Sequence, residues 1–361
     1  MKNTTKRILA LLLTLCMLTA LTVSAFAEGN KLENYLMIGD SISIYCGTDT
    51  WSHNGTYSDR LAKDPDLGIR VLSRLAHPGW GVQEGLLVLG GSDYTNEVGR
   101  YWSGQTADEM RNYSPTVLGD LAGADLITIQ LGANNILGTG VGVLRKAFEQ
   151  DGFQFNGSCV DRQIIACLDR LEDDLSDTEA LIKLLNLLET TERGMVLLKN
   201  VLKIVPSTIT DFQKSWDALM ERIYKVNPHA KVVVIGIYNP VGMILKKTIN
   251  DNLDLDEKLQ PLLDSTEQLI RHTTSVFADA LNLYMRSGSR YARQYVYVDV
   301  TEVDLTGTMD GSHLGAVGHQ YFYEKIKNAI VTHYLPESVP ATKTTPTGLL
   351  GKLVSGLKKL F

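Results

Sequence analysis

The sequence predicts a doubly wound, three-layer α/β/α (flavodoxin-like) protein with a central parallel sheet of about five strands. Two observations predict it. Five short runs rich in Val, Ile, Leu or Tyr recur along the chain, and helical patterns flank each of them. Glycines or polar residues directly follow several of the runs, as expected where buried strands end. The five runs cover residues 36–38, 68–75, 125–131, 231–237 and 295–300.

The first run, Leu36–Ile38, ends in Gly39, Asp40 and Ser41. A short apolar run is typical of a strand buried on both faces, and a glycine after it allows the chain to turn sharply. Ser41 is therefore expected at the carboxyl edge of the sheet, where open α/β sheets bind their ligands. A serine at this place can also simply cap the next helix, so the other strand ends must decide its role.

Three further strand ends carry residues of chemical interest. After the second run, the glycines in residues 76–81 either present a backbone N–H to an oxyanion or only make a turn. After the third run, the asparagines in residues 131–135 either donate to an oxyanion or only make a turn. Asp310 and His313 lie three residues apart in a turn-rich loop after the last run, a separation that lets a tight turn aim a base and its orienting partner toward the same place. His319 falls in the helical pattern that follows, where packing or a surface position is expected.

Together these blocks resemble those of the GDSL lipases and acylhydrolases, also called SGNH hydrolases. The resemblance covers almost all of the core, from about residue 35 to residue 334. It implies that Ser41 is the nucleophile and that His313 is the base, oriented by Asp310. The family's histidine is often followed by proline, whereas Leu314 follows it here.

The same resemblance implies an oxyanion hole formed by the N–H of Ser41, by Gly79 and by Asn134. Gly79 is preferred to Gly81 because Pro-Gly-Trp resembles the second block of secreted bacterial members. The third block of the family usually reads Gly-x-Asn-Asp, and here the last residue is Asn135. This change leaves the oxyanion asparagine in place and alters the residue that holds its loop.

The resemblance implies a serine ester hydrolase (lipase, esterase or acylhydrolase) that works through an acyl-Ser41 intermediate. A carbohydrate O-acetyl esterase is an alternative, since lipid esters and acylated glycans are both open as substrates. A surface-binding module without turnover is another alternative, and only Asn135 favours it. No metal or other cofactor is implied, because no His, Cys or acidic residues have ligand spacing. A net charge of −6 argues against nucleic acid as a partner.

The chain is expected to contain four parts. Residues 1–27 have a basic start, an apolar run and a small-residue cleavage site, which predict a signal peptide and a secreted or extracellular protein; a retained anchor is the alternative. Residues 28–334 form one hydrolase domain, with a helical insertion at 138–210 that covers the site or only buttresses the fold. Residues 335–347 are a Pro/Thr linker. Residues 348–361 are a basic amphipathic helix for a membrane surface, or for docking on the enzyme.

Three cysteines remain after the predicted signal peptide, Cys46, Cys159 and Cys167. An odd number leaves at least one of them unpaired in a monomer of an exported protein. Cys159 and Cys167 are close enough in sequence to pair, but no disulfide framework is evident. The stability of the protein is therefore expected to come mainly from its core.

Overall fold

The computed structural model describes residues 32–47, 51–52, 54–92, 105–113, 115–135, 159–173, 177–239, 274–305 and 313–335. Several predicted features lie outside these residues. They are the signal peptide 1–27, residues 138–158 of the insertion, Asp310, all of the linker after Leu335, and the tail 348–361.

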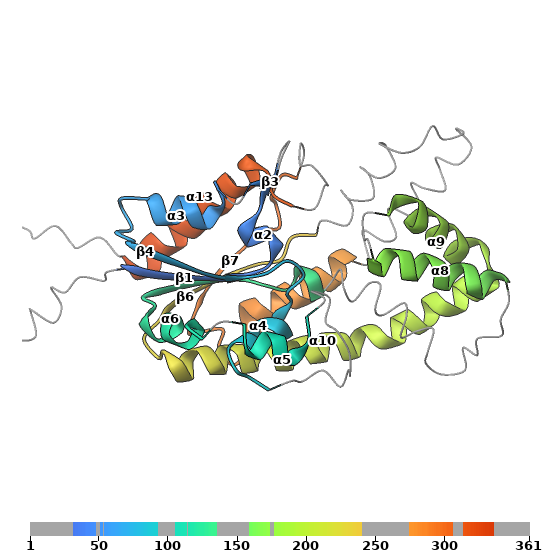
Figure 1. The fold of residues 1–361 in the computed structure, drawn as a ribbon, viewed down its shortest axis with the longest axis horizontal. Helices are drawn as coiled ribbons and strands as arrows, with labels where there is room; N and C mark the ends of the chain where they lie inside the picture. The colour runs from blue at the N-terminus through green and yellow to red at the C-terminus, as the bar shows by residue number, and fades with distance from the viewer. Residues whose placement is uncertain are drawn as a thin grey trace, which may run out of the picture.

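A five-stranded parallel sheet forms the centre of the fold, with the strand order β4-β1-β5-β6-β7 (Figure 1). In chain order this is 2-1-3-4-5, the flavodoxin-like arrangement, so the predicted fold class is confirmed. Each of the five apolar runs overlaps one strand. The strands are β1 (Asn34–Gly39), β4 (Val71–Ala76), β5 (Leu126–Gln130), β6 (Lys231–Ile235) and β7 (Val296–Val298).

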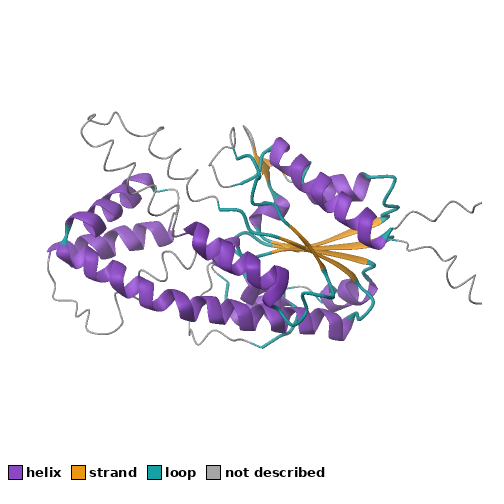
Figure 2. Ribbon diagram, turned by 180° about the vertical axis from the view of Figure 1, so that it is seen from behind, coloured by secondary structure: helices purple, strands orange, loops and turns teal. Residues whose placement is uncertain are grey.

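Helices cover both faces of the sheet, as the two ribbon views show (Figures 1 and 2). On one face α3 (Tyr57–Lys63) packs against α13 (Ala316–Tyr334). On the other, α4 (Val82–Val88) and α6 (Val117–Gly123) pack against α10 (Glu192–Val226). A short helix, α5 (Ala107–Arg111), lies beside α4, and residues 274–283 are also helical and continue into the π-helical turn η1 (Tyr284–Gly288). Among the described residues, no helix combines the length and apolar character needed to cross a membrane.

Because both faces are covered, the central strands are buried throughout. Every residue of β5 is buried, and so is every residue of β1 after its first. The apolar stripe near the end of α10 is buried as well and packs into the same core. It consists of Phe212, Trp216, Leu219, Met220 and Ile223, on the helix that leads into the fourth strand of the chain.

The long α10 also joins the sheet to a separate helical unit. It runs without interruption from Glu192 to Val226, so residue 210, the expected end of the insertion, lies within it. Its beginning packs with α8 (Cys159–Asp173) and α9 (Thr178–Thr190), which lie beyond the carboxyl edge of the sheet in Figure 1. Asp161 of α8, fully buried, pairs with Arg193 at 2.8 Å and ties the unit together. The extent of the insertion and its role over the site stay predictions.

The turn from β1 into α2 (Ser41–Ile44) is the tightest packing near the site. A Cβ atom added to Gly39 would lie 2.0 Å from Ser43 Oγ and 2.6 Å from Ser43 Cβ. Rotation of the serine relieves the first contact but not the second. Gly39 is therefore required for α2 to begin directly at the end of the strand.

Gly39→Ala should lower the free energy of unfolding by about 2–3 kcal/mol, because the backbone of α2 must move to admit the methyl group. Gly119→Ala is the matched control, since Gly119 is exposed on α6 with nothing within 4 Å of its added Cβ. The control should be neutral or stabilising by up to about 1 kcal/mol. Urea denaturation of both variants checks this, and equal stabilities would contradict the packing argument.

Candidate active site

Ser41 is the first residue of α2, immediately after the buried strand β1. Asp40 caps this helix, and its Oδ1 accepts the N–H of Ile42 at 2.9 Å. The N–H of Ser41 belongs to the first helical turn and has no acceptor within the helix. Neither this N–H nor the half-buried hydroxyl of Ser41 bonds to another described residue. Both groups therefore remain available at the edge of the sheet.

Asn134 lies just beyond the end of the neighbouring strand β5, within residues 133–135, which are helical. Its Nδ2 donates to the carbonyl of Trp80 at 2.9 Å and to Asp40 Oδ2 at 3.3 Å. These two bonds hold the amide beside the residue that precedes Ser41. Two of the predicted blocks, 94 residues apart in sequence, thus meet through a direct contact.

The glycine turn after β4 distinguishes the two candidate donors. Gly79 has a φ of +82°, a conformation that favours glycine, and its N–H bonds to no described residue. The N–H of Gly81 instead donates to Glu84 Oε2 at 2.9 Å. This geometry agrees with the preference for Gly79, whose oxyanion role stays a prediction.

Asn135, the departure from the family's third block, has a structural task. Its Oδ1 accepts the N–H of Val82 at 3.0 Å, the first residue of α4. Gly81 at the N-cap has no side chain to do this, so Asn135 caps the helix from a distant segment. A Cβ on Gly81 would lie 2.7 Å from Asn135 Oδ1 and 3.1 Å from Glu84 Oε2, so these two oxygens are close neighbours.

Asn135→Asp should therefore place a second carboxylate beside that of Glu84. We expect a loss of about 1–2 kcal/mol of stability at pH 7, because like charges at such short range disfavour ionisation. In a chain that also carries Glu84→Gln, the same change should cost much less. Chemical denaturation of the four proteins measures this coupling, and additive effects would show that the two carboxyl groups do not interact.

His313 lies near the other end of α2. Its half-buried ring stands edge-on to Tyr45, with centroids 6.2 Å apart, and Tyr45 is the C-cap of α2. The next residue, Leu314, is fully buried, and its carbonyl accepts the N–H of Gly47 at 3.2 Å. Leu314 thus packs into the core where the family often has proline. Asp310, the predicted partner of His313, lies outside the described residues.

Asp40 links these parts electrostatically, although sequence reasoning assigned it no role. It is completely buried, with a relative accessibility of 0%. Burial raises its pKa to about 7, while the N–H of Ile42 and the positive charge that His313 can carry oppose the rise. An acid that directly precedes a helix is an N-cap signal that was available in the sequence.

The ionisation of Asp40 should be visible in protein stability. The folded-state pKa of about 7 lies above the usual value near 4, so the protonated form is favoured on folding. The corresponding stability is present below pH 4 and is lost as pH rises to 7, by on the order of 3–4 kcal/mol. Asp40→Asn resembles the protonated acid and should lack this loss.

Urea denaturation of both proteins at several values between pH 4 and pH 7.5 measures the difference. Burial lowers the pKa of His319 to about 4, which gives a pH dependence of opposite sign, but this contribution is common to both proteins and cancels. Parallel stability curves would show that Asp40 does not titrate in this range.

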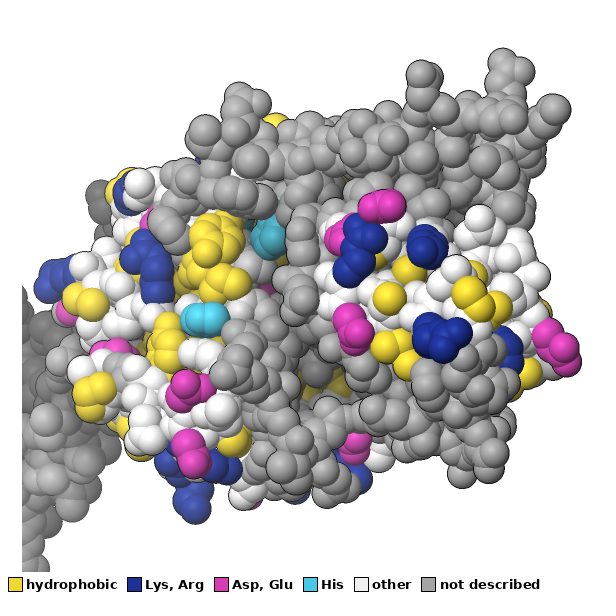
Figure 3. All heavy atoms as spheres, turned by 45° about the vertical axis from the view of Figure 1, so that its right-hand side comes forward, with side chains coloured by type: hydrophobic (Ala, Val, Ile, Leu, Met, Phe, Trp, Pro, Cys, Tyr) yellow, Lys and Arg dark blue, Asp and Glu magenta, His cyan; other side chains and the backbone are white. Residues whose placement is uncertain are grey.

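An aromatic group supports the glycine turn. Trp80 is fully buried, and its indole N–H donates to Gln105 Oε1 at 2.7 Å. His77 stacks on it at 5.7 Å between ring centroids, and Tyr113 meets it edge-on at 4.9 Å. Trp80 also supplies the carbonyl that holds Asn134, a role that its side chain gave no reason to expect. Figure 3 shows histidine side chains beside grouped hydrophobic ones on one face of the molecule.

The described residues contain no group of three or more His, Cys, Asp or Glu side chains placed to hold a metal. Cys46, Cys159 and Cys167 are all free, so Cys159 and Cys167 do not pair. Among the described residues, this edge presents the hydroxyl of Ser41, the imidazole of His313, the amide of Asn134 and the buried carboxyl of Asp40.

No protein-family model matches the chain, and no curated protein shows significant similarity to it. Among solved structures, the chain is similar to a lipase from a goat rumen metagenome (16% identity, TM-score 0.41, covering 83% of this chain and 97% of that one). It is also similar to an extracellular lipase from Streptomyces rimosus (15% identity, TM-score 0.42, covering 82% of this chain and 99% of that one). A third similar structure is a family two carbohydrate esterase from Clostridium thermocellum in complex with cellohexaose (14% identity, TM-score 0.37, covering 84% of this chain and 65% of that one). These similarities are weak, and the site rests on its own contacts.

Proposed function

We propose that the chain is a serine ester hydrolase of the GDSL (SGNH) type. One observation carries the proposal: blocks from distant parts of the sequence converge at the carboxyl edge of one parallel sheet. Asp40, next to Ser41, contacts Asn134 directly and lies within electrostatic range of His313. This is the location at which open α/β sheets bind ligands.

In the proposed reaction, His313 takes the proton of the Ser41 hydroxyl as its oxygen attacks the ester carbonyl. The N–H groups of Ser41 and Gly79 and the amide of Asn134 donate to the resulting oxyanion, and loss of one such donor costs about 3–4 kcal/mol. His313 returns the proton to the departing alcohol, and water then releases the acid from acyl-Ser41. Asp310 orients the imidazole.

The amide of Asn134 already has two acceptors, so an oxyanion must replace one of them. Its bond to Asp40 is 3.3 Å long, against 2.9 Å for its bond to Trp80. The longer bond is the one to be exchanged, and the shorter bond keeps the amide oriented during this exchange. The donor is therefore in position before the substrate arrives, as efficient electrostatic stabilisation requires.

A non-catalytic binding module is the second candidate, and the structure weakens its basis. Asn135 is the only feature that favours it, and the Oδ1 atom of Asn135 caps α4. Within the hydrolase proposal, lipid esters and acetylated glycans both remain candidate substrates. Secretion through residues 1–27 and contact of residues 348–361 with a membrane surface belong to the same proposal and rest on the sequence pattern alone.

Ser41→Ala should abolish hydrolysis of nitrophenyl esters, by at least about a thousandfold in kcat, because the acyl-enzyme can no longer form. Ser287→Ala is the matched control, since this exposed serine lies on η1, away from the carboxyl edge. Esters of increasing acyl-chain length, measured beside acetylated sugars, separate a lipase from an O-acetyl esterase.

Retention of activity within about tenfold of wild type in a folded Ser41→Ala protein would contradict the assignment of the nucleophile. A wild-type protein that binds acylated glycans or lipid vesicles but hydrolyses none of the esters would favour the binding module. Circular dichroism of each variant establishes that it is folded.

A further inference from the structure

The helix that carries Ser41 is too short to hold itself in place. It has four residues, a single turn, and isolated turns of this length are unstable in water. Its position must therefore come from contacts outside the helix. At its end, the carbonyl of Tyr45 accepts a hydrogen bond from His319 Nε2 at 2.7 Å. His319 lies on α13, in the segment that follows His313.

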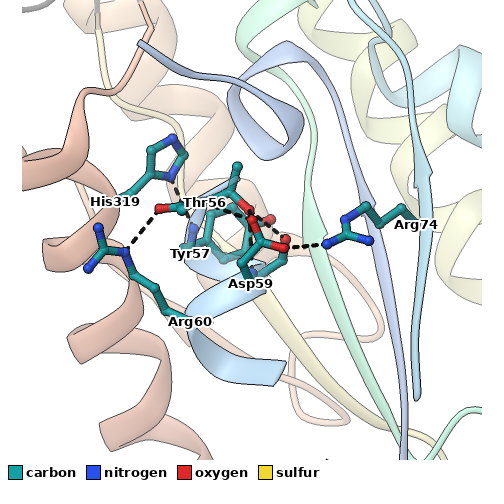
Figure 4. A network of polar contacts seen from close by, with 8 residues as sticks. Thr56, Tyr57, Asp59, Arg60, Arg74 and His319 are labelled. Carbon is teal, nitrogen blue, oxygen red and sulfur yellow. Dashed lines mark hydrogen bonds and ion pairs between the residues drawn. The ribbon is translucent and has the colours of Figure 1, made fainter. Parts of the chain in front are cut away.

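The second ring nitrogen of His319 is also engaged. Its Nδ1 accepts the N–H of Tyr57, the first residue of α3, at 3.1 Å (Figure 4). Both partners are backbone groups with fixed roles, a donor and an acceptor, so the imidazole must be neutral with its proton on Nε2. His319 is fully buried, and this burial lowers its pKa to about 4, which keeps it neutral at physiological pH.

The side chain of Tyr57 also contacts α2. Its hydroxyl lies 2.9 Å from Ser43 Oγ, on α2 itself, so His319 and Tyr57 together contact both the end and the middle of that helix. Arg60 joins α3 to the start of α13, through the carbonyl of Ala316 at 3.4 Å and through the side chain of Gln320. The start of α13 is therefore fixed relative to α2 and α3.

We propose that His319 is a positioning residue for the reaction proposed above, on which this inference rests. Only Leu314 and Gly315 separate His313 from α13. The bond between His319 and Tyr45 thus sets the separation between the helix of the nucleophile and the loop of the base. The alternative is a core histidine that contributes only to stability. If His319 positions the site, its loss should shift His313 relative to Ser41, and a shift of about 1 Å costs on the order of a hundredfold in rate.

Two substitutions separate the contacts of His319. In His319→Gln the terminal amide reaches the position of Nε2 and can donate to Tyr45, whereas in His319→Asn the shorter amide reaches only the position of Nδ1 and can accept from Tyr57. Both should lower the melting temperature similarly. His319→Asn should lower kcat about 10- to 100-fold with KM within about threefold, and His319→Gln should keep kcat within about threefold of wild type.

Thr56→Ala is the matched control for stability. Thr56 Oγ1 accepts the N–H of Asp59 and caps α3 beside Tyr57 (Figure 4), and its other side-chain hydrogen bonds are with Ser58 Oγ and Asp59 Oδ2. This variant should lose thermal stability and keep kcat. Equal kcat values in the two His319 variants, an equal loss of kcat in Thr56→Ala, or a loss above about tenfold in His319→Gln would each overturn the proposal.

Hydrogen–deuterium exchange of residues 41–47 provides a readout that does not depend on hydrolysis. Exchange should be faster in His319→Asn than in His319→Gln, and equal rates would overturn the proposed contact. If Ser41→Ala and wild type hydrolyse esters equally, the proposed function fails instead. The exchange result still decides whether His319 holds α2.

Discussion

The rest of the site depends on two hydrogen bonds that the buried carboxyl group of Asp40 accepts. It caps the helix of Ser41 through the N–H of Ile42 and accepts a bond from the amide of Asn134. A carboxyl group removed from water favours its neutral form, which is why its pKa rises to about 7. The protein retains this unfavourable burial at a position that joins the ends of two neighbouring strands.

Around Asp40, the parallel sheet and the longer helices α3 and α13 hold the short helix α2 in place. The parallel register places Gly39 opposite Ala76 and Gln130, so three strands end together at one edge. The one-turn α2 has little stability of its own, and contacts from α3 and α13 determine its position. The sheet therefore sets the distance between Ser41 and Asn134, while His319 and its neighbours set the relation between Ser41 and the loop of His313.

Asn135 and Leu314, at which the sequence differs from the blocks that it resembles, both make contacts near the site. Asn135 retains a carbonyl oxygen to cap α4, and a neutral amide suits a position close to the carboxylate of Glu84. The side chain of Leu314 is fully buried, and its backbone carbonyl accepts the N–H of Gly47. In both cases packing and backbone bonds hold the segment.

The sequence by itself determined the five strands, the fold class and the strand ends at which Ser41, Gly79 and Asn134 lie. These follow from local patterns, because buried strands read as apolar runs and glycines mark the turns that end them. Only the tertiary structure decided the burial of Asp40, the capping role of Asn135 and the contacts of His319. Each depends on a partner far away in the chain: 53 residues separate Asn135 from Val82, and 274 separate His319 from Tyr45. A local pattern carries no information on such pairings, since they arise only once the sheet has brought its strand ends together.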